Sequence, residues 1–159
     1  MDHTVSVGSV HINFTPYALA RLSNAIYNTT LHYDDDAPIG EYLLWCISIE
    51  LGLKAAILSK NNSKSRQKKN KNEIGHDLIK AGEAFHVKFG YKLFDKKDIQ
   101  ALNQINPYFK NKSMEYFEIE TIVALMKGLS TFPDLNNIKT VATKVNKFLS
   151  ENKYFVDLH

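Results

Sequence analysis

Two charged side chains interrupt an otherwise apolar segment in the first half of the chain. Glu50 and Lys54 lie between Leu43 and Leu58, and their i,i+4 spacing places them on one face of a helix. One interpretation is a helix-internal ion pair that neighbouring helices partly bury. The other interpretation is functional: Glu50 orients a ligand or His76, and Lys54 faces a phosphate.

The dipeptide His76-Asp77 is the second place where chemistry is expected. It stands at the start of a segment with helical periodicity, so Asp77 is expected to cap that helix and to complement its dipole. The alternative is that the exposed amides of the first helical turn bind an anion, with His76 and Lys80 beside it. The sequence leaves both interpretations open.

Positive charge is concentrated in one short segment. The chain has a net charge of +3, but six basic residues fall between positions 60 and 71, and the remainder of the chain carries 14 basic against 17 acidic residues. The segment is either a solvated loop or a contact for nucleic acid, whose phosphates would bind it without sequence preference. Its candidate binding residues are Lys64, Arg66, Lys68, Lys69 and Lys71.

An aromatic segment at 107–117 offers a second kind of contact. Tyr108 and Tyr116 lie close in sequence to Lys112, and aromatic rings beside cations can stack on bases. Such rings are more often part of a core or an interface, so this remains an alternative.

Several other classes of site find no support in the sequence. Cys46 is the only cysteine, which excludes an intramolecular disulfide and a cysteine zinc centre. The histidines show no metal-ligand spacing, and we predict no metal and no cofactor. Residues 1–30 lack the features of a signal peptide, and the longest apolar run is shorter than a membrane span, so we expect a cytoplasmic chain without a membrane partner.

The expected architecture is all-α, a five- or six-helix bundle in a single domain over residues 1–159, with a β-hairpin at 5–14 as an appendage. Helices are predicted near 16–30, 39–60, 76–89, 95–106, 118–129 and 134–149, and 60–73 is predicted to be an exposed loop. The helix at 39–60 is apolar around its circumference and should be central. The buried stripe predicted for the first helix consists of Leu19, Leu22, Ala25, Ile26 and Thr29.

The central helix and the segment after it resemble the HEPN (higher eukaryotes and prokaryotes nucleotide-binding) superfamily. The resemblance rests on Trp45-x-x-Ser48-x-Glu50-Leu51-x-Leu53-Lys54-Ala55 and, after the basic segment, Gly75-His76-Asp77-Leu78; it is looser from Asn106 to Tyr116. It implies a helical bundle that binds a nucleotide, RNA or a protein partner. It also implies a homodimer and a role in a prokaryotic defence or stress system.

Many HEPN proteins are metal-independent ribonucleases, in which an arginine precedes a histidine by four to six intervening residues. The histidine moves a proton and the arginine holds the phosphate. Here His76 is the matching histidine and hence the catalytic candidate, but Lys69, Asn70 and Lys71 occupy the arginine positions. Lysine can neutralise a phosphate but lacks the planar fork of arginine.

Three hypotheses follow. The leading one is a HEPN-like domain that binds a nucleotide, RNA or a protein partner without catalysis. The second is an endoribonuclease that uses His76 with Lys69 or Lys71 in place of arginine. The third is a structural protein–protein interaction module.

Overall fold

The structure, a computed structural model, describes residues 15–33, 38–60, 74–115, 123 and 132–158. Every regular element in these ranges is helical: α1 (Pro16–Leu31), α2 (Pro38–Ser59), α4 (Leu78–Phe89), α5 (Lys96–Lys110), α7 (Leu135–Glu151) and the 3-10 segment η1 (Lys153–Leu158). The prediction of an all-α chain is therefore confirmed for the described part. The predicted hairpin at 5–14, nearly all of the predicted helix at 118–129 and nearly all of the loop at 60–73 lie outside it.

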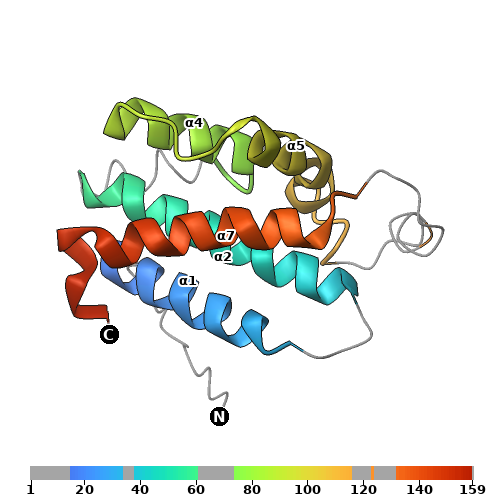
Figure 1. The fold of residues 1–159 in the computed structure, drawn as a ribbon, viewed down its shortest axis with the longest axis horizontal. Helices are drawn as coiled ribbons and strands as arrows, with labels where there is room; N and C mark the ends of the chain where they lie inside the picture. Colours follow the sequence, from blue (N-terminus) through green and yellow to red (C-terminus); the bar gives the residue numbers. More distant parts are fainter. Residues whose placement is uncertain (1–14, 34–37, 61–73, 116–122, 124–131, 159) are drawn as a thin grey trace, which may run out of the picture.

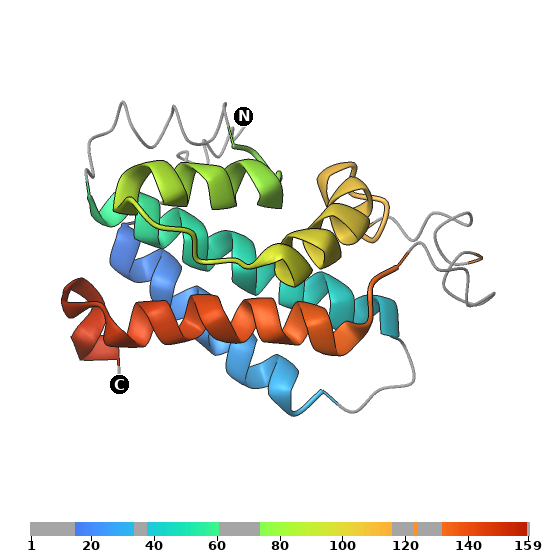
Figure 2. The same cartoon turned by 45° about the horizontal axis from the view of Figure 1, so that its top comes forward.

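Helix α2 is the centre of the bundle, as its composition predicted. It packs against α1, α4 and α7, and the ribbon shows α1 along one side of it, α4 along another and α7 across it (Figures 1 and 2). The side chains of Trp45, Cys46, Ile49 and Leu53 have no exposed surface. An all-round apolar helix is stable here because three other helices cover it.

Helix α2 is longer than the uninterrupted apolar run on which the membrane prediction was based. Its 22 residues have a mean hydropathy of 1.5 over the most apolar window, so by length and composition α2 is the one helix of the described residues that could cross a membrane. In this fold 67% of that window is buried inside the protein, which is what the central helix of a bundle requires.

Of the predicted stripe of α1, Leu19 is buried and Ile26 is half-buried, but the prediction is wrong for Leu22, Ala25 and Thr29, which are exposed. Leu22 is 41% exposed, whereas Ala20 and Ser23 face the core. The Ser23 hydroxyl donates to the Ser48 carbonyl at 2.8 Å, and the Ser48 hydroxyl donates to the Ser23 carbonyl at 3.1 Å. The small residues Ala20 and Ser23 let the two backbones approach closely, and the larger Tyr27 of α1 packs edge to face on Trp45 of α2.

The close approach also requires Gly52. A Cβ atom on Gly52 would lie 2.4 Å from Cγ1 of Val145 and 2.9 Å from the Ser23 hydroxyl. Because two helices press on this position, any larger residue would push α1 or α7 away from α2.

Helix ends follow the sequence closely, with one exception. Asp77 caps α4, Gly90 ends it with φ at 78°, and Asp95 and Asp98 form a capping box at the start of α5. Proline was expected to end α5 at 106–107, but the helix continues through Pro107 to Lys110. Burial of Phe109 in the core favours the extra turn and offsets the backbone hydrogen bond that is lost because Pro107 has no N–H group.

Helix α7 closes the bundle. It begins after Asp134 as predicted and buries Ile138, Val141, Val145 and Leu149. The segment η1, which the sequence did not predict, follows it and lies against the first half of α1, where Phe155 is fully buried (Figure 1).

Candidate functional site

Glu50 connects the central helix to the turn that precedes α4. Its residue surface is 6% exposed, and its two carboxylate oxygens have different partners. Oε1 accepts from the Lys54 ammonium at 2.5 Å, and Oε2 lies 3.0 Å from Nδ1 of His76. The ion-pair interpretation and the interpretation that Glu50 orients His76 are therefore both correct, because each uses a different oxygen.

The position of His76 depends on a short turn. The chain enters the turn at Ile74, which is buried, and passes Gly75 with φ at 53°, a conformation that favours glycine. The sequence predicted a helix that starts at His76. In the structure His76 lies in the turn before α4, which begins at Leu78. The rings of His76 and Phe109 pack edge to face, with their centroids 6.0 Å apart and an angle of 89° between the ring planes.

The contact with Glu50 determines which ring nitrogen of His76 carries a proton. A carboxylate oxygen only accepts hydrogen bonds, so the proton between Glu50 and Nδ1 belongs to the histidine. Nε2 has no hydrogen-bond partner among the described residues, and the side chain is 43% exposed. A neutral His76 can accept a proton at Nε2, and a protonated His76 can donate a hydrogen bond to an anion.

A second carboxylate, that of Asp77, lies next to His76 in the chain; it is also buried and has three hydrogen-bond partners. One oxygen of Asp77 accepts from the Lys80 amide at 3.1 Å and from Nδ2 of Asn106 at 3.0 Å. The other oxygen accepts from the Lys110 ammonium at 3.0 Å. Burial acts to raise the pKa of Asp77, but these hydrogen bonds outweigh it and lower the pKa below its ordinary value.

These bonds decide between the two interpretations of the start of α4. Asp77 is the helix cap, and the Leu78 amide donates to Oδ1 of Asn106 at 2.9 Å. The Leu78 and Lys80 amides are thus already bonded, so an anion at this place would rely on side chains. Glu50 and Asp77 offset Lys54 and Lys110, and His76 adds a positive charge when it is protonated.

The remaining predicted site residues fall into two groups. Lys80 is exposed on the first turn of α4, Lys112 follows α5 with φ at 60°, and the ring of Tyr108 stacks on Phe132 with centroids 4.4 Å apart. One face of Tyr108 is therefore already packed, as the core interpretation of the aromatic segment required. The residues that lie outside the described ranges are Lys64, Arg66, Lys68, Lys69, Lys71 and Tyr116.

Three neighbours of His76 and Asp77 were not predicted as site residues. Asn106, Phe109 and Lys110 all belong to the last part of α5. The expected helix end at Asn106-Pro107 placed Phe109 and Lys110 in an irregular segment, with no fixed direction toward α4. The sequence did place the ring of Phe109 and the charge of Lys110 in the aromatic segment at 107–117, a possible base-stacking contact, and the looser part of the family resemblance begins at Asn106.

Other reactive groups are unsuited to chemistry. Cys46 is fully buried, and burial strongly raises the pKa of its thiol, so it stays protonated and inert. Among the described residues no group of three or more histidine, cysteine, aspartate or glutamate side chains could hold a metal ion. Comparison of the chain with protein-family models, with curated proteins and with solved structures finds no match.

Proposed function

We propose that this chain is a HEPN-like helical domain that binds the phosphate of a nucleotide or an RNA at the exposed edge of His76, without cleaving it. The observation that carries the proposal is the arrangement of that histidine. Buried Glu50 fixes its Nδ1, while Nε2 stays free of protein partners among the described residues and the ring remains open to solvent. A structural histidine needs no such combination of a buried anchor and an accessible nitrogen.

Cations around His76 support a phosphate ligand. Lys54 and Lys110 neutralise the carboxylates of Glu50 and Asp77. Lys80 is exposed on the first turn of α4, four residues after His76, and has no ion-pair partner among the described residues. Lys71 is five positions before His76 in the sequence, so chain length alone limits their separation to about 18 Å. We therefore include the basic residues between 64 and 71 in the proposed contact with nucleic acid.

Binding without cleavage is proposed because the arginine of the ribonuclease motif is missing. A lysine at position 69 or 71 would neutralise a phosphate but could not hold two of its oxygens at once. We also propose, from the resemblance alone, that the protein is a cytoplasmic homodimer.

The test is a titration of a fluorescently labelled single-stranded RNA, and separately of ATP, with the full chain. His76→Ala should weaken binding by about tenfold, the loss expected of one charge-assisted hydrogen bond. His32→Ala is the matched control, because His32 is an exposed histidine on α1 whose Nδ1 lies against the Asn28 carbonyl. Equal affinities of the two variants for both ligands would refute the proposal.

A second candidate function is metal-independent RNA cleavage. The hydrogen bond between Glu50 and His76 favours it, because a carboxylate that fixes the tautomer of a histidine also prepares it to move a proton. Incubation of RNA with the protein in the presence of a chelator decides the matter. Degradation that disappears in both His76→Ala and Glu50→Gln would establish the enzyme; intact RNA at high protein concentration would exclude it.

The titration also separates both functions from the third hypothesis. A protein that binds neither RNA nor ATP but retains one stable protein partner would be an interaction module. His76→Ala would then leave partner binding unchanged unless the partner contacts the same turn.

A further inference from the structure

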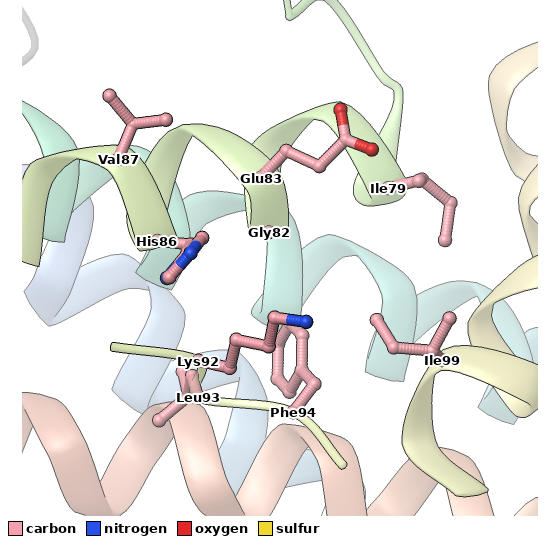
Figure 3. A pocket seen from close by; sticks show the side chains of 9 residues that line it. All are labelled: Ile79, Gly82, Glu83, His86, Val87, Lys92, Leu93, Phe94 and Ile99. Carbon is pink, nitrogen blue, oxygen red and sulfur yellow. The ribbon is translucent and has the colours of Figure 1, made fainter. Parts of the chain in front are cut away.

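A cavity outside the His76 cluster lies between α4, the connection at 91–94 and the start of α5. Its volume is about 460 Å³, within the range of pockets that hold small molecules. It shares no lining residue with the cluster of Glu50, Lys54 and His76. The residues that line it are Ile79, Gly82, Glu83, His86, Val87, Lys92, Leu93, Phe94 and Ile99 (Figure 3).

The walls of the cavity are mostly apolar. Ile79 and Val87 contribute from α4, Leu93 and Phe94 from the connection, and Ile99 from α5. Val87 is 81% exposed at the rim, which leaves apolar surface available to a ligand. Gly82 keeps the helix close to the floor, since a Cβ atom there would lie 3.2 Å from the ring of Phe94.

Two nitrogen-bearing side chains extend into this apolar space. Figure 3 shows the Lys92 ammonium and the His86 ring directed toward its middle, with the Glu83 carboxylate turned away. Among the described residues Lys92 has no ion-pair partner, in contrast to Lys54, Lys110 and Lys144. Nδ1 of His86 is buried without a hydrogen-bond partner in the same part of the chain.

Unsatisfied groups of this kind indicate the chemistry of an occupant. Lys92 is exposed, so it places an unpaired cation at the mouth of the apolar walls, where it favours an anion. The half-buried His86 ring lines the same cavity and can donate a hydrogen bond to that anion. The carboxylate of Glu83 on the helix above disfavours a ligand with a second negative charge. The rest of the ligand must be apolar, because five of the lining side chains are apolar.

We infer that this cavity binds a small apolar carboxylate, with the carboxylate group between Lys92 and His86 and the apolar body against Phe94 and Ile99. The site is independent of the proposed phosphate site at His76. It gives the protein a place for a small-molecule ligand along α4, from Ile79 near the start of the helix to Val87 near its end.

Octanoate and octan-1-ol are suitable probes, because they share a chain and differ in the charged end. Methyl and aromatic signals of Ile79, Ile99 and Phe94 would be followed by NMR on the full chain during each titration. Octanoate should shift these signals saturably and bind about fivefold more tightly than octan-1-ol, the difference expected of one partly exposed ion pair.

Variants then test the assignment. Lys92→Gln should reduce octanoate to the affinity of octan-1-ol, and Ile99→Trp, which fills the cavity, should abolish binding of both probes. Lys139→Gln is the control, an exposed lysine of α7 outside the cavity. Equal binding of the two probes to the unmodified chain, or signal changes confined to another surface, would overturn the inference.

Discussion

Two clusters of carboxylates and lysines connect the helices of this protein, and they differ in one respect. At the start of α5, Asp95 and Asp98 share the Lys144 ammonium of α7, with Asp95 at 2.8 Å and Asp98 in closer contact. On α2, Glu50 shares its carboxylate between Lys54 and His76. The first cluster contains only residues whose charge is constant near neutral pH, whereas the second includes a histidine.

The difference shows what separates a structural network from a candidate site. Lys144 has two carboxylate partners, and Asp98 also accepts from the Asp95 amide at 2.8 Å to complete the capping box. Among the described residues His76 has one hydrogen-bond partner, and its side chain is 43% exposed. A buried carboxylate paired with a lysine therefore says little about function. A side chain that is held in place by such a carboxylate, and that still has an unused hydrogen-bonding atom, is a better candidate for a site.

The largest effect is expected from breaking the structural cluster. Asp98→Ala removes the capping box and leaves Lys144 with only the exposed Asp95, so the free energy of unfolding should fall by about 2–3 kcal/mol. Urea denaturation measures this loss. Binding at His76 should not change when measured at a temperature where the variant is folded.

A matched control is the exposed pair of Lys147 and Glu151, 3.7 Å apart on α7. Lys147→Gln should alter stability by less than about 0.5 kcal/mol, because solvent screens such pairs. If the two variants lost equal stability, the Asp98 cluster would be no more structural than a surface pair.

The sequence predicts contacts between residues that are close in the chain better than contacts between different helices, and each of the two clusters contains both kinds. The capping box of Asp95 and Asp98 and the pairing of Glu50 with Lys54 are local patterns, whose members stand three and four positions apart in the sequence, and the structure contains both. The partners from other helices, Lys144 for Asp98 and His76 for Glu50, depend on packing. The sequence supported the second only as one of two interpretations and did not predict the first.

The same limit explains the errors in the fold. The stripe of α1 was chosen by apolar character, but the packing is decided by small residues, Ala20 and Ser23 facing Ser48 and Gly52. Pro107 was taken as a helix end by its local preference, and the burial of Phe109 overrides that preference. Both errors arise where a tertiary contact outweighs local propensity.

An intermediate effect is expected from acid, and it should distinguish the clusters again. The Lys144 ammonium and the Asp98 amide lower the pKa of Asp95 to about 2. A carboxyl whose pKa is lower in the folded chain stabilises fully above its ordinary value near 4, and this contribution disappears as the pH falls from about 4 to 2. The urea midpoint should therefore decrease over that range.

Removing Lys144 from the structural cluster, and Lys110 from the Asp77 pair beside the second cluster, sharpens this comparison. Lys144→Gln should flatten the acid dependence markedly, because Asp95 then loses the main cause of its lowered pKa. Lys110→Gln should flatten it less, because Asp77 retains the Asn106 and Lys80 hydrogen bonds. Identical pH profiles of the two variants would contradict the assigned causes.

Within the two clusters, the smallest effect on stability should come from His76. His76→Ala removes one hydrogen bond of a side chain that is 43% exposed, and Glu50 keeps the Lys54 ammonium as a partner. The free energy of unfolding should fall by no more than about 1 kcal/mol, because an exposed hydrogen bond contributes little net energy. Thermal and urea unfolding measure this change against the unmodified chain.

A loss as large as that of Asp98→Ala would mean that His76 serves to hold α4 on α2, and the contrast between the two clusters would then disappear. A small loss accompanied by weakened RNA or ATP binding would support the proposal that the fold holds His76 in place for a ligand.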